Sequence, residues 1–220
     1  MMITKSGFYF TSGTESEKIE IGENIQVDIF DDSLKIKTIT VGKGSVLNIF
    51  SCINSKADLE IFHEYNSRSN INLLVLGSEN NTKIKIYSII ENDGSESNLN
   101  MVSLVNNEDS IEIDSKIIIN KGVKGSSGNI KQNNIFLGEK GSIRSIPGLK
   151  IASNESKSSH SMKIEKISDE KLFYLRSRGI DKENAVLIML ESLFDSCFKN
   201  LNDDIFKNEI HEKFNDYILR

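Results

Sequence analysis

The sequence predicts a mainly β protein: a β-helix of stacked rungs followed by a small α-helical domain. Three observations support this fold class. From about Ile19 to Ile164, apolar and polar residues alternate with a period of two, as in strands that bury one face. Turn clusters rich in Gly and Asn recur roughly every 30 residues, a spacing typical of solenoids. From Ser168 onward the apolar residues lie three or four positions apart, which indicates amphipathic helices.

The alternating segments predict the interior of the β-helix. Ile84 and Ile86, for example, alternate with Lys83 and Lys85. Since successive side chains of a strand point to opposite faces, the isoleucines share the buried face. We expect the following residues in the interior: Ile84, Ile86, Ile111, Ile113, Ile117 and Ile119.

Turn clusters separate the expected strands. An aliphatic residue precedes each cluster, and a Ser or Thr with a further aliphatic residue follows it. The clusters are Gly42–Ser45, Gly77–Asn81, Asn106–Asp109 and Gly138–Gly141. This repetition favours rungs stacked about 4.8 Å apart. A β-sandwich of hairpins uses the same alternation and stays open as an alternative, although hairpin dipeptides such as Asn-Gly are lacking.

Helix signals begin at Ser168, an expected N-cap that is followed by two acidic residues. A first helix is predicted over Asp169–Arg178, ending at Gly179. Asp181 is expected to cap a second helix, and Asp203 starts a third. The predicted domains are therefore a β-helix core domain, residues 1–166, and a C-terminal helical domain, residues 167–220.

Composition bounds the class of protein. The chain has 220 residues, of which 27% are charged and 38% hydrophobic, with a net charge of −5. These values predict a globular protein without a global basic surface, so we expect no nucleic-acid partner. The first residues hold no apolar run long enough for a signal peptide or a membrane span, so a cytoplasmic protein without a membrane partner is expected.

The cysteines and two of the histidines are expected to be structural. Cys52 and Cys197 form no CxxC pair and are expected as free thiols, Cys52 in a strand and Cys197 on the apolar stripe of the second helix. His63 is expected as a rung residue, and His211 on a solvated helix face. The sequence lacks a GxxxxGK[ST] phosphate loop and the GxSxG and HExxH motifs, so we expect neither an ATPase nor an enzyme of those classes.

The start of the helical region carries a more specific signal. Lys171–Ile180 reads KLFYLRSRGI, and it is preceded by Ser145–Ile151, which reads SIPGLKI, and by Ser158-Ser159-His160. This order of motifs resembles the C-terminal signature of the SufB/SufD family of iron–sulfur cluster assembly scaffold proteins. The good match covers about residues 115–198, and the chain is short for the family.

The resemblance implies a scaffold subunit. In this family two β-helix subunits pair, and each helical domain docks the ABC-type ATPase SufC. We therefore expect as partners a SufC-like ATPase and either a SufB-like paralogue or a second copy of this chain. The resemblance implies no permanently bound cofactor, but a transient iron–sulfur cluster or iron at the subunit interface.

The resemblance also gives candidate site residues. His160 matches the family's histidine, and a neutral imidazole can ligate iron. The alternative is that His160 only satisfies a hydrogen bond at the β-to-α junction. The expected docking residues are Leu172, Phe173, Tyr174, Leu175, Arg176, Arg178, Gly179 and Ile180. Here the alternative is that Leu172 and Phe173 pack the helices onto the end of the β-helix. No catalytic residue is expected.

Two departures from the SufB pattern favour a SufD-like subunit. Near Gly138–Gly141 some SufB proteins carry a cysteine, and this chain has none there. Ser161 and Met162 follow His160, where SufB often has Glu and then Ala. Two other functions stay open. A carbohydrate-active β-helix enzyme would need clustered carboxylates, whereas the acidic residues here are scattered. A polymerising structural β-helix would need free ends, and a C-terminal helical domain opposes stacking at that end.

Overall fold

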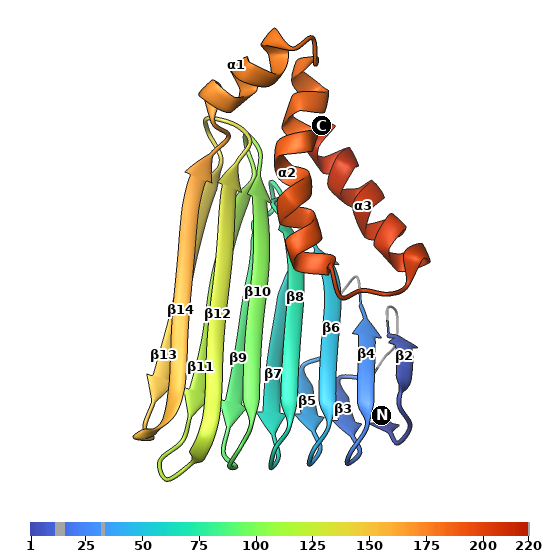
Figure 1. The fold of residues 1–220 in the computed structure, drawn as a ribbon, viewed down its shortest axis with the longest axis vertical. Helices are drawn as coiled ribbons and strands as arrows, with labels where there is room; N and C mark the ends of the chain where they lie inside the picture. The colour runs from blue at the N-terminus through green and yellow to red at the C-terminus, as the bar shows by residue number, and fades with distance from the viewer. Residues whose placement is uncertain (12–15, 32–33, 220) are drawn as a thin grey trace.

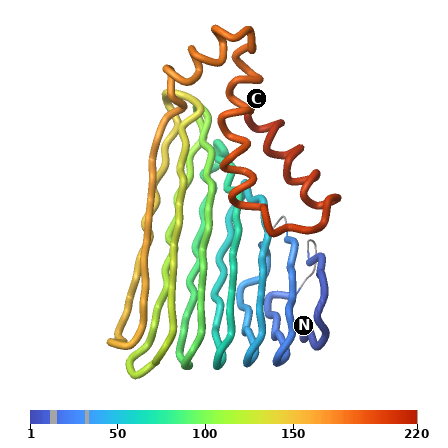
Figure 2. Tube along the Cα trace, in the orientation of Figure 1, coloured from blue at the N-terminus to red at the C-terminus, as the bar shows by residue number. Residues whose placement is uncertain are grey.

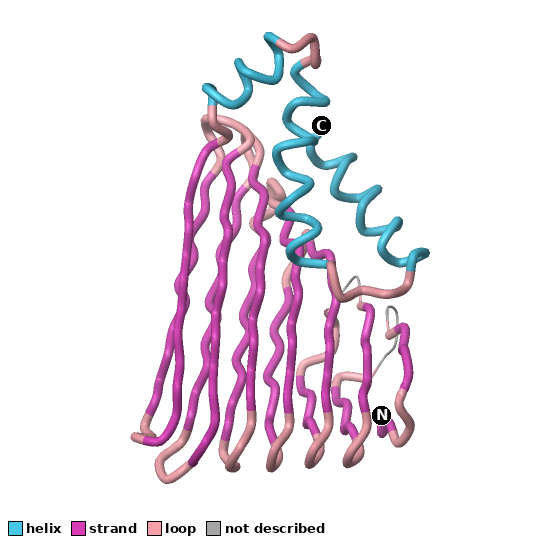
Figure 3. The backbone as a smooth tube through the Cα atoms, viewed as in Figure 1, coloured by secondary structure: helices cyan, strands magenta, loops and turns pink. Residues whose placement is uncertain are grey.

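The computed structural model describes residues 1–11, 16–31 and 34–219 (Figure 1). In these residues the chain forms fourteen strands and then three helices, so the predicted order of a β region followed by helices is confirmed (Figure 3). The strands are β1 (Met2–Ile3), β2 (Gly7–Phe10), β3 (Lys18–Ile21), β4 (Gln26–Phe30), β5 (Thr38–Val41), β6 (Val46–Ile53), β7 (Ala57–His63), β8 (Arg68–Leu76), β9 (Thr82–Ile90), β10 (Glu96–Val105), β11 (Ser110–Ile119), β12 (Lys124–Phe136), β13 (Ser142–Ile151) and β14 (Glu155–Lys166). The helices are α1 (Asp169–Ser177), α2 (Lys182–Phe198) and α3 (Asp204–Leu219).

The strands build two parallel sheets. The odd-strand sheet has the order β1-β3-β5-β7-β9-β11-β13, and the even-strand sheet the order β14-β12-β10-β8-β6-β4-β2. Neighbouring strands within each sheet run parallel, as in the pairs β9–β11 and β10–β12. Hairpins pair antiparallel strands, so the β-sandwich alternative was wrong and the β-helix is confirmed.

The rungs become longer along the chain, whereas the sequence predicted a constant repeat of roughly 30 residues. Lys18 pairs with Thr38 twenty residues later, whereas Ser110 pairs with Ser142 thirty-two residues later. The strands lengthen in step, from 4 residues in β2 to 12 in β14. The solenoid therefore tapers from a wide end at β13 and β14 to a narrow end at β1 and β2 (Figure 1).

The interior between the two sheets is aliphatic. One apolar cluster runs through the solenoid and includes all six predicted interior residues: Ile84, Ile86, Ile111, Ile113, Ile117 and Ile119. Each is at most 2% exposed. Burying one such side chain contributes roughly 1.5–3 kcal/mol, so the alternation seen in the sequence reflects the main source of stability.

A second apolar core lies on the outer face of the even-strand sheet, under α2 and α3. In β8, Leu73 and Val75 face the interior, while Leu74 and Leu76 belong to the outer core. The thiols of Cys52 and Cys197 are buried in this outer core, which confirms their predicted packing role. The helices thus pack along the carboxyl halves of the even strands (Figure 1).

The turns that follow the odd-numbered strands line up along one edge of the solenoid (Figure 2). Asn24, Gly44, Asn66 and Gly94 occupy equivalent positions there, and all have positive φ, from 55° to 72°. Each donates its backbone N–H to a carbonyl in or directly after the next turn, for example Asn66 to Asp93 at 2.9 Å. Asn and Gly tolerate this left-handed conformation best, which explains why these residues recur at the turns.

The helix boundaries follow the predicted caps. The Ser168 hydroxyl accepts a hydrogen bond from the Lys171 N–H at 3.3 Å. Gly179 follows α1 with a φ of 86°, and Asp181 accepts from the Asn184 N–H at 3.0 Å, a contact that also lowers the pKa of the Asp181 carboxyl. β14 ends at Lys166 and α1 begins at Asp169. None of the helices in the described residues is long and apolar enough to cross a membrane.

Candidate functional site: the terminal rung and the helical corner

The terminal rung, which we define as β13 and β14, is the last rung of the wide end. Each of its strands pairs with a neighbour on one side only. Three apolar side chains on it are therefore open to solvent: Ile146, Met162 and Ile164 are 47%, 42% and 48% exposed. Unpaired strand edges that carry apolar side chains are surfaces on which another chain can pair.

His160 lies in the middle of β14. Its register partner on β12 is Ile130, a residue of the interior core, and the preceding rung places Leu99 at the same position. His160 therefore ends a column of inward-facing side chains. It is exposed because no later rung of this chain covers it, which leaves an imidazole open at the end of the solenoid.

The interior just beneath this end contains a polar side chain among the aliphatic ones. The Gln132 amide donates to the Ser115 hydroxyl at 2.9 Å, and its carbonyl accepts from the Ser145 hydroxyl at 2.8 Å. Gln132 is the register partner of Met162. These two hydrogen bonds fix the spacing between the two sheets at the wide end, because a buried amide needs hydrogen-bond partners for both its nitrogen and its oxygen.

The second candidate surface is the helical corner, where α1 turns into α2. None of the residues of α1 is buried, and Phe173 is 75% exposed. Leu172 is half-buried and faces the turn that contains Gly138, together with Phe136 and Leu137. The alternative in which Phe173 packs onto the β-helix was therefore wrong, whereas Leu172 does lie toward the ends of the strands.

A groove of about 570 Å³ marks this corner, lined by Phe173, Arg176, Ser177, Gly179, Ile180, Asp181 and Lys182. Tyr174 and Arg178 lie beside it, with the guanidinium 5.3 Å from the centre of the Tyr174 ring. Leu175 is half-buried. The corner thus combines exposed aromatic and guanidinium groups, which are the side chains that most often anchor protein interfaces.

The terminal rung and the corner are joined directly. β14 leads through Ile167 and Ser168 into α1, and at this junction Lys166 pairs with Glu139 at 2.6 Å. His160 and the expected docking residues thus lie on consecutive elements, and His160 is not among the residues that line the groove at the corner. Sequence reasoning missed the exposed Met162 and Ile164, which lie two and four residues after His160 and therefore on the same face of the last strand before the helices.

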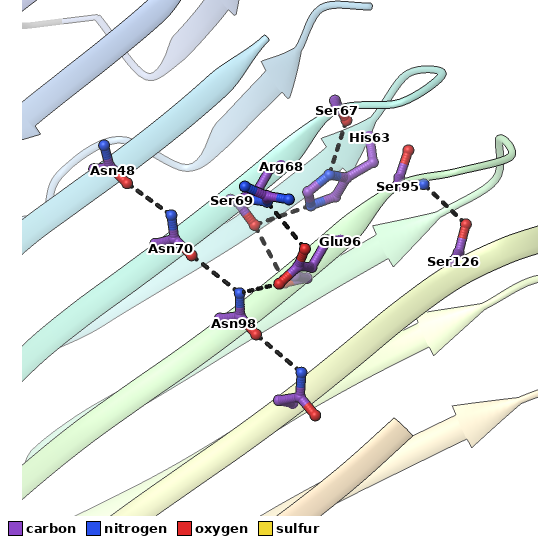
Figure 4. A network of polar contacts seen from close by, with 12 residues as sticks. Asn48, His63, Ser67, Arg68, Ser69, Asn70, Ser95, Glu96, Asn98 and Ser126 are labelled. Carbon is purple, nitrogen blue, oxygen red and sulfur yellow. Dashed lines mark hydrogen bonds and ion pairs between the residues drawn. The ribbon is translucent and has the colours of Figure 1, made fainter. Parts of the chain in front are cut away.

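His63 has a structural role within the β-helix. It is buried in β7 and lies within hydrogen-bonding distance of the hydroxyls of Ser67 and Ser69, at 3.0 and 3.1 Å (Figure 4). The Ser88 hydroxyl lies 3.1 Å from the same ring. Burial lowers the pKa of His63 to about 4. The prediction of a rung residue is confirmed.

His211 does not lie on a fully solvated face as expected. It is half-buried between α2 and α3 and contacts Glu191 at 2.8 Å. Its ring also lies edge-on to Phe194, with the centroids 4.9 Å apart. Among the described residues, no group of three or more His, Cys, Asp or Glu side chains is placed to hold a metal ion.

A parallel β-helix with an open terminal rung and an exposed helical corner is a scaffold that presents two surfaces to its surroundings. Residues 38–193 match the family described as "SUF system FeS cluster assembly, SufBD core domain". This match covers most of the chain, and the protein therefore belongs to the SufBD family of the SUF iron–sulfur cluster assembly system.

Individual relatives agree with this assignment. The iron–sulfur cluster assembly protein SufD of Escherichia coli is 29% identical over 85 residues, which are 39% of this chain and 20% of the relative. A SufBD family protein of Pyrococcus horikoshii is 29% identical over 102 residues, 44% of this chain and 23% of the relative. A SufBD family protein of Methanothermobacter thermautotrophicus is 27% identical over 131 residues, which are 60% of this chain and 32% of the relative. The chain thus spans about a fifth to a third of the length of these relatives.

Proposed function

We propose that this chain is a cytoplasmic scaffold subunit of the SUF machinery, rather than an enzyme, which pairs through its terminal rung and docks a SufC-like ABC ATPase through its helical corner. The single observation that carries the proposal is the exposure of the KLFYLRSRGI segment. This segment carries the family resemblance, yet α1 buries none of its residues. A motif of aromatic, aliphatic and Arg residues that is not needed for the core is available for a partner.

The terminal rung supports the pairing half of the proposal. Two strands of 10 and 12 residues end the solenoid with free edges and exposed apolar side chains. Pairing with a SufB-like paralogue or with a second copy would cover them. The iron or iron–sulfur cluster is then cargo at the joined ends, where His160 offers an imidazole ligand and a SufB-like partner would add thiolates.

A SufD-like role is favoured over a SufB-like one. The turn at Gly138–Gly141 has no cysteine, and the thiols of Cys52 and Cys197 are buried in the outer core. Burial also raises the pKa of the Cys197 thiol, which suppresses the thiolate that a cluster needs. This subunit would therefore contribute the scaffold and the imidazole rather than the sulfur ligands.

The docking assignment is tested by charge reversal at the groove. Arg176→Glu should abolish capture of the SufC-like ATPase of the same SUF system in a pull-down, with the melting temperature nearly unchanged. Lys171→Glu is the matched control, because Lys171 is an exposed cation on the same helix that does not line the groove. If the folded Arg176→Glu protein captures the ATPase normally, the assignment of Arg176 to the docking site is wrong. Iron and sulfide analysis after reconstitution of the paired complex tests the cargo separately.

A further inference from the structure

We propose that a groove on the outer face of the odd-strand sheet binds a small phosphate ester whose body carries hydroxyl groups. The groove has a volume of about 670 Å³, which is within the range of small-molecule sites. Its lining comes from segments between Glu17 and Lys85, whereas the terminal rung and the helices begin at Ser142 and Asp169. The inference is therefore independent of the pairing and docking surfaces.

The groove forms at a step in the odd-strand sheet. β5 begins at Thr38, in register with Glu60 of β7, whereas β7 itself begins earlier, at Ala57. The first part of β7 therefore has no strand beside it on the side of β5. Residues 34–37, which we call the wall, border the groove at this step. The outward strand residues form its floor: Thr38, Asp58, Glu60 and Lys85.

The wall is held from inside the solenoid. Leu34 and Ile36 are 2% and 1% exposed and belong to the interior core. The Leu34 N–H donates to the buried carboxylate of Asp31 at 2.8 Å, although Leu34 has a φ of 41°, which is costly for a residue other than Gly, Asn or Asp. Lys35, between the two buried residues, is exposed. Backbone strain that surrounding contacts maintain is a recurrent feature of binding sites, and here it accompanies a preformed wall.

Ion pairs neutralise two of the four lysines that line the groove. The Lys37 ammonium lies 2.5 Å from the Glu17 carboxylate, and the Lys85 ammonium 3.4 Å from that of Asp58. The Lys85 ammonium also lies 4.7 Å from the centre of the Tyr87 ring. These contacts position the two side chains but leave little net charge for a ligand.

The other two lysines, Lys35 and Lys56, are the groups that would recognise the ligand. Both are exposed, and neither forms an ion pair within the part of the chain that the structure describes. Lys35 belongs to the wall and Lys56 to the turn before β7, so the two ammonium groups reach the groove from different segments. On a chain with a net charge of −5, they make this groove locally attractive to an anion.

The type of cation favours phosphate over carboxylate. All four cations that line the groove are lysines. An arginine fork matches a planar carboxylate through two parallel hydrogen bonds, whereas a lysine ammonium is a compact point charge that binds phosphate. A phosphate ester carries a charge of about −1.5 to −2 at neutral pH, so one phosphate group can balance both Lys35 and Lys56.

The floor specifies the other end of the ligand. Glu60 is half-buried and has no ion-pair partner in residues 1–11, 16–31 and 34–219, so its carboxylate repels the phosphate and directs it toward the wall. The same carboxylate accepts hydrogen bonds, and the Thr38 hydroxyl both donates and accepts them. A molecule with phosphate at one end and hydroxyl groups at the other, as in a sugar phosphate, matches both sides of the groove.

Titration of the full chain tests the ligand class, with amide chemical shifts as the measurement. Glucose 6-phosphate should bind saturably, with a Kd of about 1 mM, and should shift the amides of residues 34–38 and 56–60. Inorganic phosphate, which lacks the hydroxyl-bearing body, and citrate, which carries only carboxylates, should each bind at least about threefold more weakly. Absence of saturable binding, shifts confined to other residues, or equal binding of citrate would overturn the proposal.

Lysine variants test the recognition groups. Lys35→Ala and Lys56→Ala should each weaken glucose 6-phosphate about threefold, and the double variant about tenfold, because each removes one exposed charge contact. Lys43→Ala is the matched control, since Lys43 is an exposed lysine in the turn after β5 that does not line the groove, and its affinity should equal that of the wild type. An equal loss in Lys43→Ala, or no loss in the double variant, would show that only the overall charge matters and would overturn the site.

Glu60→Gln tests the orientation of the ligand. The variant removes the charge that repels phosphate, so inorganic phosphate should bind more tightly, and the preference for glucose 6-phosphate over inorganic phosphate should fall at least about twofold. An unchanged preference in a variant with the wild-type melting temperature would show that the floor does not read the hydroxyl groups, and would overturn the assignment of a hydroxyl-bearing body.

Discussion

The Tyr217 hydroxyl on α3 donates a hydrogen bond to the carboxylate of Asp109 at 2.7 Å, across a sequence separation of 108 residues. The same hydroxyl accepts from the Asn106 N–H at 3.0 Å. Burial, together with the neighbouring carboxylate, raises the pKa of the Tyr217 phenol, so the proton stays on the hydroxyl. One side chain thus attaches the last helix to the turn between β10 and β11.

Tyr217→Phe should therefore loosen the helices from the solenoid. The variant keeps the apolar ring but removes the donor to Asp109, and the loss of a hydrogen bond to a buried charged group costs about 1–3 kcal/mol. The free energy of unfolding from urea titration measures this. Tyr9→Phe is the control, because its hydroxyl donates to the Lys5 carbonyl at an exposed position. Equal stability of both variants would show that apolar contacts alone hold α3.

His63 should make stability depend on pH. Burial lowers its pKa to about 4 in the folded chain, against about 6.5 when unfolded. Between these values the unfolded chain binds more protons, so stability is present above pH 6.5 and is lost as the pH falls toward 4, by about 1.4 kcal/mol per unit and about 3 kcal/mol in all. Denaturant titrations at pH 7.5, 5.5 and 4.5 should show a shallower decline in His63→Gln. If the free energy of unfolding falls equally with pH in the wild type and in His63→Gln, His63 does not contribute to the pH dependence.

Among the turns that follow the odd-numbered strands, two glycines should lose different amounts of stability when they are replaced by alanine. Gly94 has a φ of 72°, and a Cβ there would collide with the Asn66 side-chain oxygen of the preceding turn. Gly122 has a φ of 85°, but a Cβ there meets nothing within 4 Å. Both alanine variants carry the left-handed penalty of about 1–2 kcal/mol, so Gly94→Ala should lose about 1 kcal/mol more. Equal losses in thermal melts would mean that the Asn66 side chain swings away freely.

Ile111→Asp should prevent folding. Ile111 is 1% exposed within the interior core, and the variant loses its burial and also places a carboxylate among aliphatic side chains, at a total cost of about 4 kcal/mol or more. Circular dichroism and solubility should show an unfolded or aggregated chain. Glu112→Gln, at the adjacent outward position, should stay folded. A soluble Ile111→Asp variant that melts cooperatively would contradict the register of β11.

Local signals were sufficient for much of the fold. Ile111 and Ile113 could be placed because a period of two needs only neighbouring residues, and Ser168 and Asp181 could be placed because capping is local. The widening of the rungs could not be predicted, since alternation reports the face of a residue and not the length of a turn. His211 was misplaced because its contact with Glu191 joins two helices, and a single helix pattern does not show which partner it meets.

The candidate site was only partly visible in the sequence for a similar reason. His160, Met162 and Ile164 alternate with polar residues just as the buried positions of earlier strands do. Their exposure follows from being last in the stack, which is a property of the whole solenoid. Leu74 and Leu76 show the opposite case, because an uninterrupted apolar run became two cores once α2 and α3 covered the outer face.

The taper of the solenoid has a consequence for symmetry. Strands of 10 and 12 residues close one end, whereas strands of 2 and 4 residues close the other. A wide end stacked on the narrow end of the described strands would leave more than half of its edge unpaired, which disfavours head-to-tail growth into filaments. Two wide ends match in length, and the proposed pairing between two copies of this end would be isologous and would close the assembly at two subunits. The gradient in rung length would therefore make assembly through this end self-limiting.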